Sequence, residues 1–556
     1  IQSMELMSSK SEARKHLEKI GVEMIPGYAG DKKDLKTYLK EAKRIGYPVI
    51  VKPSLGGGGK GMRIVNKESD FKELLSQAQR ESNNAFGDDK IIIEKYITDG
   101  RHIEIQLLGD KFNNLIHLYE RECTIQRRYQ KIIEESPSPA INNSIRKSMC
   151  NSALSIGKSL KYDSLGTVEY IYDIKTKKFY FLEVNTRLQV EHPVTEMVYD
   201  VDLVEQMIRI AAGEPIALSQ ENVRANGWAI ECRLYAEDPY RNFMPSIGRL
   251  TRCRPPEETD SVRIDTGVAE GSEITMFYDP MIAKLITRGQ DRFAAINAME
   301  AALDAYYVRG INHNMSFLSA LIGHQRFVDG HLTTAFIDEE YSDGFGGAPR
   351  EGVVLDALLA AGVLTHHRRV RHEGTINGQL HHYQPTLGVE WVVNLDDASY
   401  QVAVSDVEGG FNVSLSERLI EVRSDWRPGQ RLFRGTVNGR DVIIQTDPVT
   451  GGYHMCHRGI EATSTVRTFR EAELAALMPV KLPPDTSKYL LCPMPGLLVS
   501  VDVEEGEEVK AGQALAVVEA MKMENILRAE RDGIVSVLRA VPGDSLAVDE
   551  IILEFE

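Results

Sequence analysis

Short apolar runs and longer segments with helical periodicity alternate over residues 1–340. Three runs, at 47–54, 91–97 and 102–110, are apolar and β-branched enough to predict buried strands. A helix is predicted from Ser9 to Ile20, where Gly21 ends it, and a second over 291–308. Because strands and helices alternate, this part of the chain is typical of an α/β fold.

The pattern changes at residue 351. One apolar helix is predicted at 353–364, and segments that alternate apolar and polar residues follow, separated by Gly, Asp and Asn turns. Such a series predicts an all-β unit, of which a barrel is one form. Residues 480–489 contain two adjacent prolines and no periodicity, so we interpret them as a linker.

The last segment contains an internal repeat with a period of 37 residues. Residues 496–499 (Gly-Leu-Leu-Val) correspond to 533–536 (Gly-Ile-Val-Ser), and the two copies span 496–519 and 533–556. Two copies of one strand-turn-strand pattern predict a flattened β-barrel with a pseudo-twofold axis. Lys522 comes just after the first copy, where we expect a two-residue hairpin tip.

Composition limits the classes of partner. The chain has 556 residues and a net charge of −16, which argues against non-specific binding of nucleic acid or of an anionic membrane. Apolar runs are all shorter than the roughly 20 residues that a membrane span needs. The six cysteines form no CxxC pair, so the sequence indicates neither a zinc site nor a disulfide framework, and a reducing compartment is expected. Residues 1–20 have no charged-then-apolar pattern, so we expect no signal segment there.

A glycine-rich loop follows the first predicted strand. The stretch KPSLGGGGKGM (52–62) has four consecutive glycines at 56–59, flanked by Lys52 and Lys60. Glycines let backbone amides approach phosphate oxygens closely, and the two lysines add positive charge. The loop matches neither GxxxxGK[ST] nor GxGxxG, and a plain flexible loop is the alternative.

An acidic hairpin is predicted at 166–185. If its turn centres near Thr176, Glu169 and Glu183 lie opposite one another on antiparallel strands, where like charges destabilise a sheet. A hard cation between them would remove that conflict, and Asn185 lies on the same face. A register shift of one residue would instead leave an exposed hairpin with solvated glutamates.

Two further stretches are rich in charge. In EVNTRLQVE (183–191), Glu183, Asn185, Arg187, Gln189 and Glu191 share one face if the chain is extended. An arginine there suits a planar oxyanion such as bicarbonate, and a neighbouring glutamate could take its proton. The stretch 121–131 carries three arginines and a lysine, which indicates either a second anion site or a solvated helix face.

These motifs resemble one enzyme family. KPSLGGGGKGMRIV, RHIEIQLLGD, FLEVNTRLQVEHPVTE and ECRLYAEDP resemble the biotin carboxylase part of biotin-dependent acyl-CoA carboxylases, an ATP-grasp enzyme. EAMKMEN resembles the family's biotinylation motif, with Lys522 as the modified lysine. The resemblance covers essentially the whole chain and is greatest to the propionyl-CoA carboxylase α subunit.

The resemblance implies roles for individual residues. A first set lines the ATP site: Lys10, Lys52, Glu94, Lys95, Ile97, His102 and Gln126, with Gly56, Gly57, Gly58 and Gly59 closing over the phosphates. A second set holds Mg²⁺, with Mn²⁺ as an alternative: Glu169, Glu183 and Asn185. A third set binds bicarbonate: Lys131, Arg187, Gln189 and Val190. Glu191 is implied as the base that deprotonates bicarbonate. Arg233 steadies the charge that develops on the biotin ureido group.

The same resemblance implies the architecture. It predicts an ATP-grasp region (1–198), a biotin carboxylase C-terminal subdomain (199–342), a helix-plus-barrel domain that binds the β subunit (351–487) and a biotinyl domain (488–556). A Rossmann-like subdomain would precede Ile1 in the family, and nothing in this chain corresponds to it. The implied partners are a carboxyltransferase β subunit, in an α6β6-like assembly, and a biotin protein ligase. The implied compartment is a bacterial cytoplasm or a mitochondrial matrix.

Two alternatives to an active ligase remain at this point. The chain could be a carrier and scaffold whose ATP-grasp part does not turn over. It could also bear lipoate, since lipoyl domains share the repeat, although they usually place acid and alanine rather than Met521 and Met523 around the lysine. The acyl-CoA substrate is not encoded in this chain, because in the family the β subunit selects it.

Overall fold

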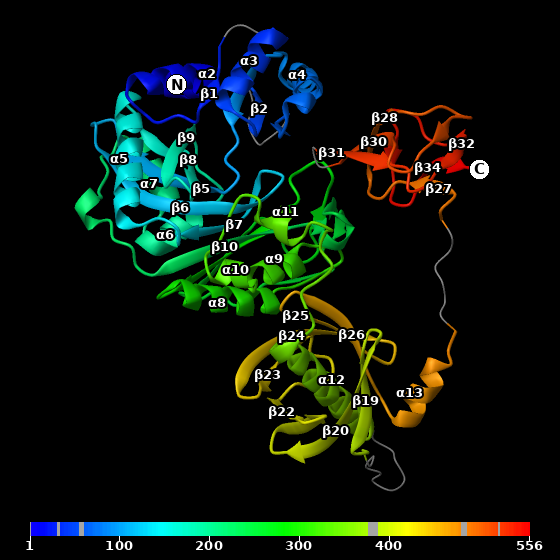
Figure 1. Ribbon diagram of the computed structural model, residues 1–556. Helices are drawn as coiled ribbons and strands as arrows, with labels where there is room; N and C mark the ends of the chain where they lie inside the picture. The colour runs from blue at the N-terminus through cyan, green and yellow to red at the C-terminus, as the bar shows by residue number, and fades with distance from the viewer. Residues whose placement is uncertain (1, 31–33, 55–60, 376–386, 480–485, 521–522) are drawn as a thin grey trace.

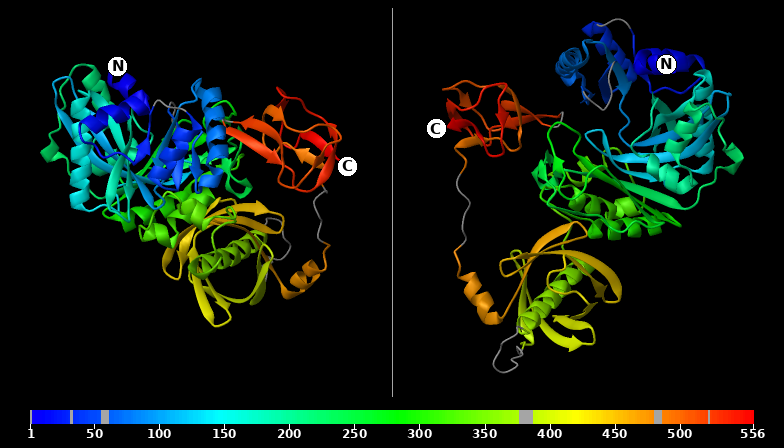
Figure 2. Two further views of the ribbon diagram at one scale, coloured as in Figure 1. Left: turned by 45° about the horizontal axis from the view of Figure 1, so that its top comes forward. Right: turned by 180° about the vertical axis from the view of Figure 1, so that it is seen from behind.

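The computed structural model describes residues 2–30, 34–54, 61–375, 387–479, 486–520 and 523–556. Three bodies follow one another along the chain: an α/β body, a β-barrel around a helix, and a small β unit at the C-terminus (Figure 1). Figure 2 shows that the C-terminal unit lies beside the α/β body and apart from the barrel. In the described ranges no helix is long and apolar enough to cross a membrane.

A four-stranded sheet forms one end of the α/β body. Its order is β1-β4-β2-β3, and strands β2 and β4 confirm the two strands predicted at 47–54 and 91–97. Helices α3 and α4 contact it, and Tyr38, Phe71 and Leu75 are buried between the layers. The bounds are β1 (Gly27–Tyr28), α3 (Leu35–Ile45), β2 (Val49–Pro53), β3 (Arg63–Val65), α4 (Phe71–Phe86) and β4 (Ile91–Lys95).

The N-terminal segment is helical, as predicted. Helix α2 (Lys10–Lys19) follows α1 (Gln2–Ser8), and its N-cap is Ser9, whose hydroxyl accepts the Glu12 amide. A serine at this position satisfies one of the amides that the first turn leaves without an intrahelical partner. The helix thus begins and ends where the sequence pattern places it.

An eight-stranded sheet carries the rest of the α/β body, in the order β15-β17-β10-β7-β6-β5-β8-β9. Strands from both sides of the expected boundary at residue 198 are hydrogen-bonded in this one sheet, since β10 pairs with β7. Its strands are β5 (Gly100–Gly109), β6 (Leu115–Arg127), β7 (Gln130–Ser136), β8 (Ser164–Asp173), β9 (Lys178–Asn185), β10 (Trp228–Tyr235), β15 (Val262–Thr266) and β17 (Met281–Gly289). Three helices that contact it are α5 (Asn143–Ser159), α6 (His192–Tyr199) and α7 (Leu203–Ala211).

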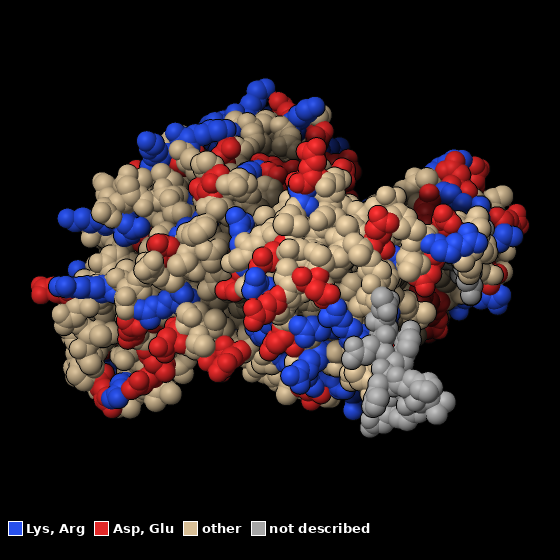
Figure 3. Space-filling view, turned by 90° about the horizontal axis from the view of Figure 1, so that it is seen from below, with Lys and Arg blue, Asp and Glu red and all other residues tan. Residues whose placement is uncertain are grey.

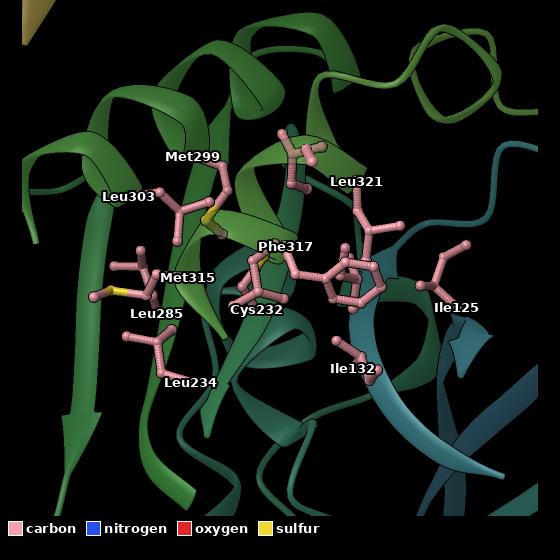
Figure 4. Close-up of a cluster of buried hydrophobic side chains, with 14 of the residues drawn as sticks. Ile125, Ile132, Cys232, Leu234, Leu285, Met299, Leu303, Met315, Phe317 and Leu321 are labelled. Atoms are coloured by element: carbon pink, nitrogen blue, oxygen red, sulfur yellow. The ribbon is translucent and has the colours of Figure 1, made fainter. Parts of the chain in front are cut away.

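The largest core lies under α8 (Arg292–Ala305) and α9 (Met315–Ile322). Figure 4 shows Met299 and Phe317 from these helices packed over Cys232 and Leu285 of β10 and β17. The predicted helix 291–308 runs three residues past the end of α8. It ends at Ala305 because Tyr307–Arg309 form β18, which pairs with β14 (Arg252–Arg254).

The basic stretch 121–131 is a hairpin, so the helical alternative for it is wrong. Strand β6 ends at Arg127, β7 begins at Gln130, and the two residues are Cα partners. Arg128 and Tyr129 form the connection, with φ of 50° and 67°. Such a two-residue turn with positive φ matches the twist of antiparallel strands.

The predicted barrel is present, and it is wrapped around a helix. Strands β19 to β26 close on themselves, and α12 (Gly352–Glu373), longer than the predicted 353–364, packs inside them with Leu358, Leu359 and Val363 fully buried. The strands are β19 (Glu390–Leu395), β20 (Ala398–Val407), β21 (Gly410–Leu415), β22 (Arg418–Ser424), β23 (Leu432–Val437), β24 (Arg440–Val449), β25 (Gly452–His457) and β26 (Ile460–Arg467). Helix α13 (Phe469–Ala476) follows, before the predicted linker, of which 480–485 lie outside the described residues.

Polar contacts join the barrel to the α/β body. Asp447 of β24 accepts hydrogen bonds from Arg309 at 2.8 Å and from the Tyr307 hydroxyl, and His457 lies 2.9 Å from Asp304. On the face that Figure 3 shows, basic and acidic side chains are intermixed over these two bodies.

The C-terminal unit consists of two four-stranded sheets, as the repeat predicts. Their orders are β27-β34-β32-β29 and β31-β30-β28-β33, so each sheet combines strands of both copies. Strands β28, β29 and β30 each begin 37 residues before β32, β33 and β34. The bounds are β27 (Tyr489–Leu491), β28 (Gly496–Val501), β29 (Glu508–Val509), β30 (Ala514–Ala520), β31 (Met523–Arg528), β32 (Gly533–Leu538), β33 (Ser545–Leu546) and β34 (Ile551–Phe555).

The expected hairpin tip is two residues long. Ala520 of β30 and Met523 of β31 are Cα partners, so the connection consists of residues 521 and 522. Lys522 itself lies outside the described residues.

Candidate functional site

Lys131 of β7 is the centre of a buried group of charges on the eight-stranded sheet. Its Nζ lies 2.6 Å from Oε2 of Glu104, 2.6 Å from Oε1 of Glu191 and 3.0 Å from Oε1 of Glu169. Burial by itself lowers the pKa of Lys131, but the carboxylates of Glu104 and Glu169 outweigh burial and raise the pKa well above its usual value. The structure therefore places a permanent cation among three carboxylates.

Glu191 is shared by two cations. Its Oε2 accepts a hydrogen bond of 2.9 Å from Arg233 of β10, and Arg233 also donates from Nε to Glu134 at 2.6 Å. Burial opposes the ionisation of Glu191, yet Lys131 and Arg233 hold its pKa well below the usual range. Glu191 is thus an ionised carboxylate, 1% exposed, at the N-cap of α6.

The acidic hairpin has the predicted register. Glu169 of β8 and Glu183 of β9 are Cα partners, but only because a bulge shifts the register between Glu169 and Tyr170. Without the bulge, Glu169 would lie opposite Leu182 and Glu183 would point to the other face. The Nδ2 of Asn185 is 2.8 Å from Glu169 and 3.4 Å from Glu183, so the three side chains converge.

This convergence fits a hard divalent cation. Two carboxylates and one amide offer oxygen ligands, the type that Mg²⁺ prefers, and the Asn185 amide can present its oxygen after a flip. Burial opposes the ionisation of Glu169, but Lys131 and His102 lower its pKa, with His102 Nε2 at 2.9 Å. A second metal-ligand group in the described residues, His102, Glu104 and Glu169, overlaps this one.

A second cluster of expected residues lies on the four-stranded sheet and on α2. Lys52 Nζ is 2.7 Å from Oε2 of Glu94, whose other oxygen is 3.3 Å from Arg14. Lys10 interacts electrostatically with Glu183 and with this pair, and burial lowers its pKa. Lys10, the first residue of α2, therefore interacts with both clusters, the acidic hairpin and the four-stranded sheet.

The remaining expected residues are placed as follows. The Nε2 of Gln126 is 2.9 Å from Nδ1 of His102, and the Nε2 of Gln189 is 3.3 Å from Oε1 of Glu169. His102, Gln126 and Gln189 are therefore part of the network. Arg187 is exposed beside it and bonds the Leu188 carbonyl and Gln189. Not in the network are Lys95, which donates to the carbonyls of Gly46 and Tyr47, and Ile97, which is half-buried after β4. Val190 contributes its carbonyl to Lys284, and Gly56, Gly57, Gly58 and Gly59 lie outside the described residues.

Sequence reasoning missed three charged residues that hold this network. Arg121 is fully buried and donates to Glu104, Gln106 and Thr195, and Glu134 anchors Arg233. Lys284 fixes the Val190 carbonyl at 3.0 Å. One signal was available: His102, Glu104 and Gln106 alternate along a strand that is otherwise apolar, a polar row on a buried face.

A buried acid lies behind Arg233. Glu231 of β10 is fully buried, is the Cα partner of Glu134, and neither of its carboxyl oxygens has a hydrogen-bond partner in the described residues. Burial raises the pKa of Glu231 well above 4.5, and the nearby Glu134 raises it further. Because Arg233 compensates Glu134, Glu231 is the member of the pair that carries the proton.

This arrangement can bind a small anion and polarise it. Two buried cations, Lys131 and Arg233, flank an ionised carboxylate, and a carboxylate pair suited to a hard cation lies on the neighbouring strands. A low-dielectric environment strengthens each of these interactions relative to water. Such chemistry suits activation of an oxyanion beside a metal–phosphate group.

Four family models match consecutive parts of the chain. They are "Carbamoyl-phosphate synthase L chain, ATP binding domain" at 9–219, "Biotin carboxylase C-terminal domain" at 231–339, "Propionyl-coenzyme A carboxylase BT domain" at 358–481 and "Biotin-requiring enzyme" at 488–555. The order of these models follows the order of the three bodies described above.

Curated relatives match over the full chain. The propionyl-CoA carboxylase α chain of Ruegeria pomeroyi is 50% identical, and the match covers 100% of this chain and 84% of the relative. The mitochondrial propionyl-CoA carboxylase α chain of Homo sapiens is 40% identical, with 100% and 77% covered.

Solved structures match the α/β body. The biotin carboxylase domain of Hydrogenobacter thermophilus 2-oxoglutarate carboxylase, in complex with MgADP, ADP and bicarbonate, has a TM-score of 0.59 at 42% identity. That match covers 61% of this chain and 74% of the other. A biotin carboxylase from Campylobacter jejuni, in a β,γ-ATP complex, has a TM-score of 0.59 at 41% identity and covers 61% and 75%.

Proposed function

Because this chain belongs to the propionyl-CoA carboxylase α-chain family of biotin-dependent carboxylases, we propose that the Lys131–Glu191–Arg233 network is the place where it activates bicarbonate. The chain carries out ATP-dependent carboxylation of biotin as the α subunit of an acyl-CoA carboxylase, and it uses biotin, ATP, Mg²⁺ and bicarbonate. Its partner is a carboxyltransferase β chain.

Bicarbonate binds between the ammonium of Lys131 and the guanidinium of Arg187, with Gln189 and the Val190 backbone at its edge. Glu191 accepts the proton of bicarbonate. In the structure two cations lower the proton affinity of Glu191: Lys131, with Nζ at 2.6 Å, and Arg233, at 2.9 Å. An entering anion competes for Lys131, so Glu191 gains proton affinity when the substrate is present.

ATP and its metal occupy the space between the two clusters. Glu169, Glu183 and Asn185 hold Mg²⁺, which neutralises charge on the transferring phosphoryl group. The side chains that position the nucleotide are Lys10, Lys52, Glu94, His102 and Gln126, with Lys95 and Ile97 contributing near the β4 end and Gly56, Gly57, Gly58 and Gly59 closing over the phosphates. The Lys52–Glu94 ion pair supports this assignment, because it keeps a cation on the sheet that bears the glycine loop.

Arg233 faces the negative charge that develops when a ureido group loses its proton. Its Nε donates to Glu134, and its Nη2 lies between Glu134, at 2.5 Å, and Glu191, at 2.9 Å, so the guanidinium is held beside the site. Biotin, when attached to Lys522, supplies a carboxyl acceptor that can travel to the β chain. The two-residue connection between β30 and β31 suits such an arm, because Lys522 is one of its two residues.

Several finer points belong to the same proposal. The units are 1–198, 199–342, 351–487 and 488–556, with the first two sharing one sheet. The acyl substrate of the complex is propionyl-CoA, the assembly is α6β6-like, and a biotin protein ligase modifies Lys522. The compartment is a bacterial cytoplasm or a mitochondrial matrix.

The observation that carries the proposal is the sharing of buried Glu191 by Lys131 and Arg233. Its test is bicarbonate-dependent ATP hydrolysis by the protein in complex with its β chain, for wild type, Glu191→Gln and the control Glu205→Gln. Glu205 lies on α7 in a half-exposed pair with Arg209, away from the network. We expect Glu191→Gln to lose roughly 10²- to 10⁴-fold in rate, the range of general acid–base catalysis.

The control is expected to keep the wild-type rate, and intact mass establishes that all three proteins carry biotin. A Glu191→Gln rate within about threefold of wild type would contradict the role of Glu191, since loss of a general base costs at least ~100-fold. A wild-type complex that carries biotin but hydrolyses no ATP with bicarbonate would favour a carrier and scaffold instead.

A further inference from the structure

Three side chains with metal-binding atoms meet on the outside of the barrel. His454 and Cys456 are two residues apart on β25, so they share a face, and Met455 between them is fully buried in the barrel core. Glu461 of β26 is the Cα partner of Cys456. One ligand atom from each of the three lies within 4.8 Å of the other two.

The distances match the edges of a coordination tetrahedron. His454 Nε2 is 3.6 Å from Cys456 Sγ and 3.7 Å from Glu461 Oε2. With Zn–N of about 2.0–2.1 Å and Zn–S of about 2.3 Å, a regular tetrahedron has N–S and N–O edges of roughly 3.4–3.6 Å. The two separations from His454 Nε2 are therefore within a few tenths of an ångström of those that a single zinc ion would impose, and Cys456 Sγ and the Glu461 carboxylate lie within 4.8 Å of each other.

A small cavity adjoins two of the three ligands. Its volume is about 30 Å³, and Cys456, Glu461, His313 and Ser316 are among the residues that line it. A space of this size holds one water molecule or one ion. The cavity lies where the barrel meets the segment that leads into α9, so an ion there would contact both bodies.

His313 supplies an independent indication. Its Nδ1 is buried and has no hydrogen-bond partner in the described residues, and its ring interacts electrostatically with Glu461. A buried ring nitrogen without a partner is costly unless something binds it. Glu461, in turn, forms no ion pair with a lysine or arginine in the part of the chain that is described; its side-chain partners there are His454 and Ser316.

We propose that His454, Cys456 and Glu461 bind one Zn²⁺ at the junction between the barrel and the α/β body, beside the buried ring of His313. Nitrogen and sulfur ligands select zinc over Mg²⁺, which prefers oxygen. Binding replaces the proton of the Cys456 thiol by the metal, and that proton leaves to solvent. None of the three ligands belongs to the Lys131–Glu191–Arg233 network, so the metal braces the barrel rather than taking part in the chemistry of that network.

The only alternative that uses the same contacts is an ion pair between a protonated His454 and Glu461, with the thiol as a neutral neighbour. Such a pair, with the thiol in its 3.6 Å contact to His454, binds no metal and does not explain the buried ring nitrogen of His313. The two cases differ in metal content, which can be measured directly.

The test is the zinc content of the biotinylated protein after dialysis against a weak chelator, followed by competition with a coloured zinc indicator. Three proteins are compared: wild type, Cys456→Ala and the matched control Cys253→Ala. Cys253 and Cys456 are the two half-buried free cysteines, so both substitutions remove a thiol of similar exposure. We expect one zinc per chain in wild type and in the control.

Loss of a residue outside the coordination sphere already weakens metal binding about 10- to 100-fold. Cys456→Ala is therefore expected to bind zinc at least ~10-fold more weakly. His454→Gln should show the same loss, and its melting curve should no longer respond to added zinc. Absence of zinc from wild type, or equal zinc in wild type and Cys456→Ala, would overturn the proposal.

Discussion

Replacing Glu231 by glutamine should stabilise the protein at neutral pH. The Glu231 carboxyl is fully buried opposite Glu134, and its two oxygens have no hydrogen-bond partner in the described residues. Burial raises its pKa well above 4.5, and Glu134 and Glu191 add to this, whereas Lys284 and Arg233 act in the opposite direction. The folded protein therefore holds a proton on Glu231 that the unfolded chain releases.

The magnitude follows from proton linkage. Since the folded pKa is raised, the full stability is present below the unfolded pKa of 4.5 and falls as pH rises toward the folded pKa. Within that window, each pH unit lowers the free energy of unfolding by about 1.4 kcal/mol. If the folded protein keeps the proton up to pH 7, its free energy of unfolding is about 3 kcal/mol lower there than at low pH. Glutamine has the same shape and no charge at any pH, so Glu231→Gln avoids this cost.

The assay is hydrogen exchange of the β10 peptide, residues 228–235, at about pH 6 and about pH 8, because local exchange separates this sheet from the other bodies. We expect slower exchange in Glu231→Gln than in wild type at both values, with a gap that widens as pH rises, by at most about 1.4 kcal/mol per pH unit. Glu205→Gln, on the surface of α7, controls for a general effect of charge. A gap that stays constant with pH, or a variant that exchanges faster at the higher pH, would refute the reasoning.

Four other substitutions test separate parts of the structure. Lys131→Met leaves three buried carboxylates without their shared cation. The free energy of unfolding should fall by about 3–5 kcal/mol, and bicarbonate-dependent ATP hydrolysis should disappear. A melting temperature equal to that of wild type would contradict this. Glu183→Gln removes one carboxylate from the proposed Mg²⁺ site, so the Mg²⁺ concentration for half-maximal ATP hydrolysis should rise at least ~10-fold. An unchanged Mg²⁺ dependence would show that Glu183 is not a ligand. Lys522→Arg should lose the mass of one biotin when produced with a biotin ligase, and a lipoyl increment on wild type would exclude biotin. Asp447→Asn weakens the charged hydrogen bonds from Arg309 and should lower the free energy of unfolding by about 1–3 kcal/mol. Calorimetry should show the barrel unfolding at a lower temperature, with biotinylation unchanged. An identical thermogram would show that the junction does not depend on these bonds.

Features that depend on local spacing could be predicted. The 37-residue repeat placed the paired strands of the C-terminal unit, because equal spacing of apolar and turn residues gives equal strands. The start of α2 at Ser9 and its end before Gly21 were also predictable, since a capping hydroxyl and a glycine act within one turn. The site residues of the acidic hairpin share this local character, because a hairpin brings together residues that are close in the chain.

Other features depend on register and on distant neighbours. Counting from the turn correctly predicts that Glu169 and Glu183 are opposed, but the count does not contain the bulge that makes it true. The end of α8 at Ala305 was missed because the pairing of β18 with β14, a strand about 50 residues earlier, decides it.

The sequence by itself determined which residues could carry charge, where several of the strands and helices lie, and which motifs resemble a biotin carboxylase. Only the tertiary structure decided which of those charges compensate one another. Lys131, Glu191 and Arg233 come from three elements far apart in the chain, and Arg121, Glu134 and Lys284 hold them from three directions. A buried charge is stable only when partners surround it, and those partners are set by the way strands stack in space rather than by spacing along the chain.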